Sequence, residues 1–240
     1  MPAPYYQDDL VTLHLGDCRE IREWLAADVL VTDPPYGVEW TGIPTSYSRG
    51  IQVTRTQAPI AGDHSTERRD TVLEMWGAHP AICFGSWKAP RPRGVRHRLI
   101  WDKQGMAPGP VRFSFMTMDE EIYVLGDGFP ATSPPQRSVI TTRESRSLEV
   151  RRLGHPTPKP VGLMELLVGR CPPGVIADPF AGSGSTLLAA KLMGRRAVGV
   201  EIDERAAALA ARRLSDALPG LTEGLAAAPE QLGFDITTTE

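Results

Sequence analysis

The sequence predicts an α/β fold built on a doubly wound, mostly parallel sheet. Short apolar and β-branched runs that stop at glycine, proline or acidic residues alternate with segments of helical period, both near the start and in the last third of the chain. The length of 240 residues, of which 41% are hydrophobic, allows one sizeable core. We therefore expect a single domain over residues 1–240.

The expected elements follow from these runs in chain order. Alternating or β-branched runs predict strands, and apolar residues three and four positions apart predict helices. The predicted strands are 10–16, 28–32, 81–87, 97–103, 120–128 (with a turn), 174–178 and 195–202, and the predicted helices are 20–27, 67–76, 161–168, 185–193 and a last one that Asp203 caps and that runs to about 218.

Three segments lack a hydrophobic period and are expected to be loops. Residues 40–70 are rich in Gly, Pro, Ser, Thr and Arg and predict a long insertion. Residues 126–154 predict a second loop or a small subdomain. The acidic, Ala-rich residues 219–240 predict a loosely held tail.

The composition limits the setting of the protein more than its function. Since the net charge of -3 is nearly neutral, a nucleic acid would have to meet a local basic patch. Cys18, Cys83 and Cys171 are widely spaced and form no disulfide or zinc pattern. The chain shows no secretion signal and no apolar run of the roughly 18 residues that span a bilayer. We expect a cytoplasmic protein without a metal site or a membrane partner.

The segment 178–186, DPFAGSGST, predicts a glycine turn between a strand and a helix. Gly182 and Gly184 let backbone N–H groups approach a ligand closely. The third glycine of a pyrophosphate-binding turn is replaced by Leu187, which disfavours a nicotinamide dehydrogenase. Glu201 ends the next predicted strand roughly twenty residues later, where a carboxylate accepts hydrogen bonds from ribose hydroxyls. The pattern points to a nucleoside, with an ordinary tight turn as the plainer alternative.

The turn DPPY, residues 33–36, lies at the carboxyl end of a predicted buried strand. An exocyclic amino group of a base is a poor nucleophile because its lone pair is delocalised into the ring. The Asp33 carboxylate and the Pro34 carbonyl, fixed by Pro35, suit the two N–H bonds of such a group and free its lone pair to attack a sulfonium methyl. Tyr36 offers a flat face to a base flipped out of the duplex. The alternative, a Pro-Pro strand terminator, is weakened by the glycine turn.

Four motifs occur in a diagnostic order: TDPPYG at 32–37, HPTPKP at 155–160, DPFAGSGST at 178–186 and GVEID at 199–203. In this order the sequence resembles the β arrangement of the DNA amino-methyltransferases of the restriction-modification type, which act on adenine N6 or cytosine N4. The resemblance covers most of the chain outside two loops, including LGDC at 15–18 and LIWDK at 99–103. It implies a Rossmann-like class I methyltransferase fold with a circularly permuted motif order.

The resemblance also implies the cofactor, S-adenosylmethionine, and the residues around it. His155, Thr157 and Lys159 are expected at the cofactor's carboxylate end. The whole expected cofactor set is Asp17, Cys18, His155, Thr157, Lys159, Asp178, Phe180, Gly182, Ser183, Gly184, Glu201 and Ile202. The family's usual glutamate corresponds to Glu120 or Glu121. Residues 126–154 would be the target-recognition region, which is short.

Two basic runs are candidates for contacts with double-stranded DNA, although each suits a solvated face equally well. The candidate residues are Lys88, Arg91, Arg93 and Arg96 in one loop, and Arg143 and Arg146 in the other. The loop 41–66, which carries Tyr47 and follows Trp40, is expected to close over a flipped base.

The sequence favours some activities over others. By the resemblance, Asp33 in the first position of DPPY favours adenine, with cytosine N4 as the alternative. Methylation at cytosine carbon 5 lacks its nucleophilic cysteine, because Cys171 precedes Pro172. In protein-glutamine methyltransferases, which share a related turn, the glycine loop comes first. A catalytically silent DNA-binding module of the same fold, a homodimer and a cognate restriction endonuclease stay open.

Overall fold

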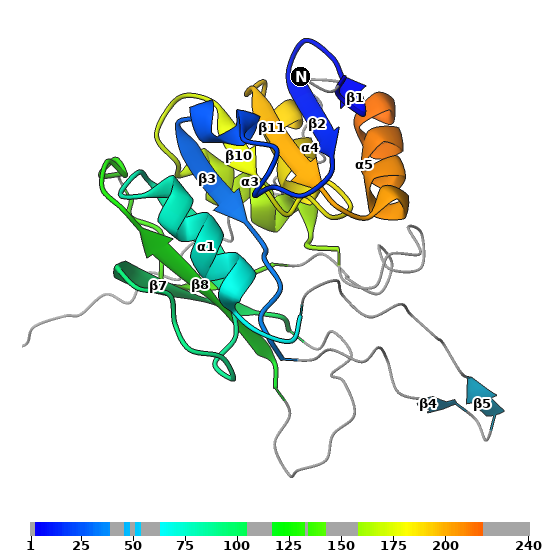
Figure 1. The fold of residues 1–240 in the computed structure, drawn as a ribbon. Helices are drawn as coiled ribbons and strands as arrows, with labels where there is room; N and C mark the ends of the chain where they lie inside the picture. Colours follow the sequence, from blue (N-terminus) through cyan, green and yellow to red (C-terminus); the bar gives the residue numbers. More distant parts are fainter. Residues whose placement is uncertain are drawn as a thin grey trace, which may run out of the picture.

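A mixed sheet of nine strands forms the centre of the part that the structure describes (Figure 1). The structure is a computed structural model, and it describes residues 3–38, 46–48, 51–53, 63–104, 117–132, 134–142 and 158–217. In sheet order the strands are β1 (Tyr6–Gln7), β2 (Val11–Leu15), β11 (Ala197–Glu201), β10 (Ile176–Asp178), β3 (Val29–Thr32), β6 (Ala81–Gly85), β8 (Asp119–Leu125), β7 (Val95–Asp102) and β9 (Val139–Thr141).

Five consecutive strands of the sheet, β2, β11, β10, β3 and β6, run parallel to one another. β8 pairs antiparallel with both β6 and β7, and β1 pairs antiparallel with β2. β9 is parallel to β7. The prediction of a doubly wound, mostly parallel sheet is confirmed, with antiparallel pairings towards both edges.

Helices cover both faces of this sheet. They are η1 (Glu23–Ala26), a short 3₁₀ helix, α1 (Glu67–Trp76), α3 (Val161–Gly169), α4 (Ser185–Leu192) and α5 (Glu204–Asp216). On one face, side chains of α3, α4 and α5 form a core with Val31. On the other face, Trp24 of η1 and Trp76 of α1 stack with ring centres 5.9 Å apart, in a cluster with Leu30. Leu30 and Val31 face opposite sides because side chains alternate along a strand.

The chain leaves β10 and β3, two neighbours in the sheet, in opposite directions. From β10 it passes through α4 to β11, and from β3 it passes through α1 to β6 on the other side. In open α/β sheets, ligands bind outside the carboxyl ends of strands at such a switch point. The DPPY turn follows β3 and the glycine turn follows β10, so the fold places both turns at this point.

Helix boundaries agree with the sequence where a cap or a hydrophobic period defines them. α1 spans the predicted residues, and the Asp203 side chain accepts a hydrogen bond from the Ala206 N–H at 2.9 Å, as expected of a helix cap. In place of the predicted helix 20–27, the structure has the 3₁₀ helix η1. A segment this short does not form a stable α-helix by itself. Burial of Trp24, whose indole N–H donates to the Cys18 carbonyl at 2.8 Å, holds this turn.

Four short strands were not expected from the sequence. β1 and β9 are edge strands of two and three residues, too short to show a period of two. β9 lies within 126–154 and buries Ile140 between the exposed Val139 and Thr141. β4 (Ser46–Ser48) and β5 (Ile51–Val53) form an antiparallel pair within the expected insertion 40–70.

The described residues contain neither a membrane-spanning helix nor a metal-binding cluster. None of the helices has the length and apolar character needed to cross a bilayer. In the same part of the chain, His, Cys, Asp and Glu side chains form no cluster of three or more suited to a metal ion.

Candidate active site

A hydrogen bond joins the two turns that the sequence singled out. Thr32, the last residue of β3, donates from its hydroxyl to Oδ1 of Asp178, the last residue of β10, at 2.8 Å. Asp33 and the glycine turn therefore begin from adjacent points at the same edge of the sheet.

The Asp33 carboxylate has a partner on each oxygen. The Tyr36 hydroxyl donates to Oδ1 at 2.6 Å, and the Lys159 ammonium donates to Oδ2 at 2.6 Å. Lys159 Nζ also lies 3.1 Å from Oε2 of Glu120 and 3.2 Å from the Tyr36 hydroxyl. Since a carboxylate offers about four acceptor positions, Asp33 keeps room for a further N–H donor.

The Tyr36 phenol is a donor at neutral pH. Burial, together with the negative charges of Asp33 and Glu120, raises its pKa well above the usual 10.0. The hydroxyl therefore keeps its proton and directs it to Asp33. As a result, Tyr36 orients the carboxylate in addition to offering the ring face that was expected to receive a base.

The Glu201 carboxylate holds the glycine turn through a hydrogen bond. Oε2 of Glu201 accepts the Gly182 N–H at 2.6 Å, and Oε1 accepts the Asp203 N–H at 2.8 Å. Gly182 (φ +53°) faces open space, since a Cβ there would meet only the Phe180 carbonyl at 3.9 Å. The turn thus presents bare backbone next to a carboxylate, which suits the sugar and methionine parts of a nucleoside cofactor.

Asp178 organises this turn from inside the protein. Burial raises its pKa to about 7, although the Thr186 and Thr32 hydroxyls and the Phe180 N–H donate hydrogen bonds that favour the charged form. The side chain is only 2% exposed. Asp178 therefore connects the two turns from within the core.

Two other residues of the expected cofactor set, Asp17 and Cys18, lie near Glu201. β2 pairs with β11 so that Leu15 is opposite Glu201, which brings Asp17 and the buried Cys18 to the same edge. Hydrogen bonds from Arg19 hold the Asp17 pKa at about 2. Leu15 and Ile202 are 37% and 43% exposed there, and they offer apolar contact to a flat ring.

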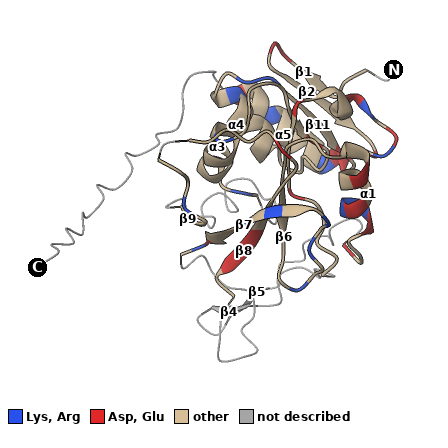
Figure 2. Cartoon of the chain, turned by 90° about the vertical axis from the view of Figure 1, so that its left-hand side faces the viewer, with Lys and Arg blue, Asp and Glu red and all other residues tan. Residues whose placement is uncertain are grey.

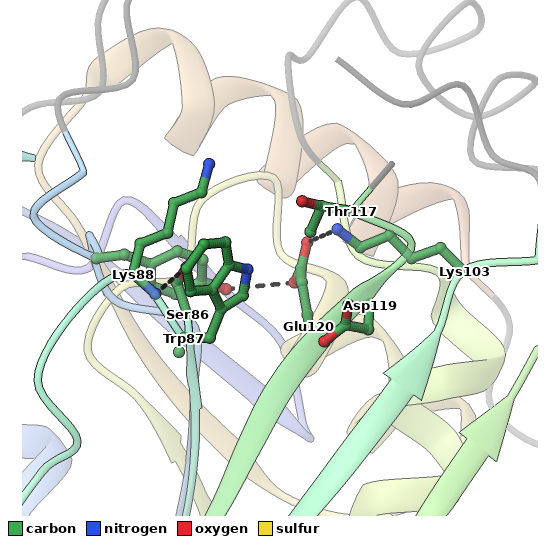
Figure 3. A pocket seen from close by; sticks show the side chains of 9 residues that line it. Ser86, Trp87, Lys88, Lys103, Thr117, Asp119 and Glu120 are labelled. Carbon is green, nitrogen blue, oxygen red and sulfur yellow. Dashed lines mark hydrogen bonds and ion pairs between the residues drawn. The ribbon is translucent and has the colours of Figure 1, made fainter. Parts of the chain in front are cut away.

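A cavity of about 150 Å³ opens next to Tyr36. Its volume is below the ~300–1,000 Å³ of pockets for drug-sized ligands and suits a group as small as one base. Figure 3 shows Trp87 on one side of it and Glu120 with Lys103 on the other. Lys103 Nζ pairs with Oε1 of Glu120 at 2.7 Å, so Glu120 lies between two ammonium groups.

The expected DNA-binding residues differ in their surroundings. Lys88 lines the cavity, and Arg93 is exposed. Arg91 pairs with Glu121 at 3.0 Å, and Arg96 pairs with Asp127 at 2.9 Å. Figure 2 shows the acidic residues of β8, the strand that carries Glu121. Two of these four basic residues thus have an acidic partner within the protein.

Some predicted site residues are not placed. His155, Thr157, Arg143 and Arg146 lie outside the described residues, as does Trp40. Their roles remain predictions.

Other residues of the site were not predicted for it. Trp87 was assigned only to a strand, and Thr32 was not considered apart from DPPY. Arg213, on α5, donates to the Ser183 carbonyl at 2.6 Å and to the Ser185 hydroxyl at 3.2 Å, and so supports the glycine turn. For Thr32, its position next to the DPPY turn was a signal that the sequence offered. The contacts of Trp87 and Arg213 arise from packing, which the sequence does not show.

The doubly wound sheet with adjacent DPPY and glycine turns defines an α/β methyltransferase. A family model described as DNA methylase, of the N6 and N4 kind, matches residues 65–212. The chain belongs to this N6/N4 DNA methylase family. It is accordingly a DNA methyltransferase that depends on S-adenosylmethionine and acts on an exocyclic amino group.

Individual proteins are similar over most of their length. The Type II methyltransferase M.ScaI of Streptomyces caespitosus is 43% identical over 258 residues, which cover 88% of this chain and 83% of the relative. The Type II methyltransferase M2.DpnII of Streptococcus pneumoniae is 40% identical, with coverage of 89% and 93%. The fold is similar to the crystal structure of an M1.HpyAVI–SAM complex, with a TM-score of 0.58 and 18% identity over 85% of this chain and 99% of the other.

Proposed function

We propose that this protein methylates the N6 amino group of adenine in double-stranded DNA, after the adenine has been flipped out of the helix. The observation that carries the proposal is the Thr32–Asp178 hydrogen bond, which connects the strand end before Asp33 to the strand end before the glycine turn. An amino group at Asp33 would therefore lie beside a nucleoside at Gly182. Base extrusion is required because an amino group inside a duplex is out of reach of such a site.

The protein's own groups orient the amino nitrogen. Asp33 accepts one N–H bond and the Pro34 carbonyl accepts the other, which draws the lone pair out of conjugation with the ring. The carboxylate is held in place by the Tyr36 hydroxyl and the Lys159 ammonium, each 2.6 Å away. When bound, the cofactor supplies the electrophilic methyl group on a sulfonium. The contribution of the chain is thus positioning of two reactants.

The residues of the expected cofactor set have proposed roles. Glu201 and the backbone around Gly182 would hold the ribose and methionine parts, while Asp17 and Ile202 would lie at the adenine. Support comes from the bare backbone at Gly182 and from the exposed apolar side chains beside Glu201.

The choice of adenine rests on Asp33 as the first residue of DPPY. Cytosine N4 methylation is the alternative, because the same acceptors suit the amino group of cytosine. A catalytically silent DNA-binding module is less well supported, since Asp33, Tyr36 and Glu201 are all present and hydrogen-bonded. The names of M.ScaI and M2.DpnII lead us to propose a role in restriction and modification.

The proposal is tested by sequencing DNA from a host that expresses the protein, with reads that detect modified bases. We expect modified adenines within one short motif, and their disappearance with Asp33→Ala. Asp216→Ala, which removes an exposed carboxylate at the end of α5, is the matched control and should leave the pattern intact. Modified cytosines would establish the alternative, and DNA without any modification would contradict both.

A further inference from the structure

Trp87 is the most exposed of the large hydrophobic side chains in the described residues, at 60%. The three other tryptophans placed by the structure, Trp24, Trp76 and Trp101, are 0%, 4% and 0% exposed. An isolated exposed apolar residue needs no explanation, but an indole beside a reactive centre does. Trp87 therefore warrants a functional interpretation.

A tight turn fixes the position of Trp87. Ser86 follows β6, its carbonyl accepts the Ala89 N–H at 3.1 Å, and its hydroxyl accepts the Lys88 N–H at 3.3 Å. β6 is the neighbour of β3, with Cys83 paired to Thr32. The turn 86–89 thus lies at the same edge of the sheet as DPPY, one strand further along.

Trp87 and Tyr36 line the same cavity. Figure 3 shows that the cavity also has a polar side. Glu120 contributes a carboxylate and Lys103 an ammonium to that side, so it offers both an acceptor and donors. Two aromatic rings and a polar edge match the two properties of a nucleobase, a flat π-face and a rim of hydrogen-bonding groups. A purely apolar ligand would make no hydrogen bond with Glu120 or Lys103.

Lys88, an exposed residue that also lines the cavity, adds a positive charge to it. Its Nζ lies 5.7 Å from the centre of the Trp87 indole. An ammonium at this position suits a phosphate of the strand from which a base is extruded. The neighbouring residues Trp87 and Lys88 therefore combine a stacking surface with a phosphate-binding group, which is how proteins hold unpaired nucleotides.

We propose that Trp87 is a nucleobase-binding residue, on which the extruded target base stacks as it occupies the cavity shared with Tyr36. The proposal rests on the proposed function, because it requires a base to leave the duplex. It adds a stacking partner outside the motifs, together with Glu120 and Lys103 as the groups that face the edge of the base.

The test compares Trp87→Ala with Trp87→Phe in steady-state methylation of DNA that contains the motif found by sequencing. Stacking of a base on an aromatic side chain corresponds to a loss of about 5- to 100-fold in kcat/KM for DNA on truncation to alanine. We expect this loss for Trp87→Ala, recovery to within about 2-fold of the native value for Trp87→Phe, and unchanged affinity for S-adenosylhomocysteine in both. Tyr5→Ala, which removes another exposed aromatic ring near the N-terminus, is the control and should behave as the native protein.

Salt dependence separates stacking from charge. The loss in Trp87→Ala should be the same at low and high salt, whereas the loss in Lys88→Ala should shrink as salt rises, because phosphate contacts are screened. Equal activity of the native protein and Trp87→Ala, or equal losses in Trp87→Ala and Trp87→Phe, would overturn the proposal.

A second measurement uses the indole itself. Acrylamide quenching of tryptophan fluorescence is measured in the native protein and in Trp87→Phe. The difference between the two reports on Trp87, and the other three placed tryptophans are buried. We expect DNA with S-adenosylhomocysteine to protect this fluorescence from acrylamide, and unprotected fluorescence contradicts stacking. If the native protein methylates no DNA at all, the proposed function fails; if it methylates DNA but Trp87→Ala is unimpaired, this inference alone fails.

Discussion

Lys159 Nζ lies 2.6 Å from Oδ2 of Asp33, a contact between residues 126 positions apart in the chain. The side chain of Lys159 is 9% exposed, and that of Asp33 is 27% exposed. An ammonium with so little access to water needs its acidic partners, and Asp33 and Glu120 provide them. The segment before α3 is thereby joined to the DPPY turn.

Replacement of Lys159 by methionine tests whether this ion pair positions Asp33. We expect Lys159→Met to lower the free energy of unfolding by about 1–3 kcal/mol, because two carboxylates lose their shared cation while Asp33 keeps some access to water. The rate of methyl transfer should fall at least about tenfold, since the carboxylate loses one of its two holders. Urea unfolding and single-turnover methylation measure the two effects.

The control is Lys159→Arg, which keeps the charge and should retain more of both quantities than methionine does. Affinity for S-adenosylhomocysteine distinguishes positioning from the role at the cofactor carboxylate that the resemblance implied. Unchanged turnover with weakened cofactor binding would favour the latter role.

The raised pKa of Asp178 predicts a pH-dependent stability. The unfolded chain loses this proton near the ordinary value of 3.8, whereas the folded protein holds it up to about 7. Between these values the native state binds more protons, so this group lowers stability as the pH rises from about 4 to 7. Asp178→Asn abolishes the titration and keeps an oxygen for the Thr32 hydroxyl. The variant should therefore gain stability relative to the native protein as the pH rises: the difference in free energy of unfolding, variant minus native, should be larger at pH 7.5 than at pH 5. An identical difference at both pH values counts against the burial of a protonated Asp178.

Two glycines with similar backbone angles separate strain from crowding in the cofactor turn. Gly184 has φ +79°, and a Cβ there would lie 2.9 Å from the Ala210 Cβ, whereas Gly194 has φ +68° with nothing within 4 Å. Gly194→Ala should cost about 1–2 kcal/mol of stability, the price of a left-handed alanine. Gly184→Ala should cost more, about 2–4 kcal/mol, because α5 must also move. Thermal unfolding of both variants decides the matter, and equal costs would show that α5 does not support the turn.

The sequence predicted the central elements because their signals are local. The buried strand before Asp33, the helix cap at Asp203 and the glycine turn each depend on neighbouring residues, and the order of the motifs indicated the family. By contrast, β9 was not predicted, and η1 was predicted as a longer helix. Both elements depend on burial of one residue, Ile140 in β9 and Trp24 in η1, and not on periodicity.

The surroundings of the reactive residues were less accessible from sequence. Lys103 was expected as the end of the predicted strand 97–103, but it pairs with Glu120 beside the cavity. Arg91 was expected to meet phosphates, yet it pairs with Glu121, which is 3% exposed. Both pairs join a residue outside the strands to β8, and they form only when the chain folds, so no spacing rule indicates them.

The central claim is that Asp33 accepts the target amino group beside a cofactor bound at the glycine turn. Single-turnover methylation by Asp33→Asn, with S-adenosylmethionine affinity measured on the same preparation by calorimetry, tests it directly. We predict affinity within about 3-fold of the native protein and a rate at least about 100-fold lower, because the variant keeps the cofactor turn and loses the charged acceptor. A native transfer rate in this variant would contradict the account.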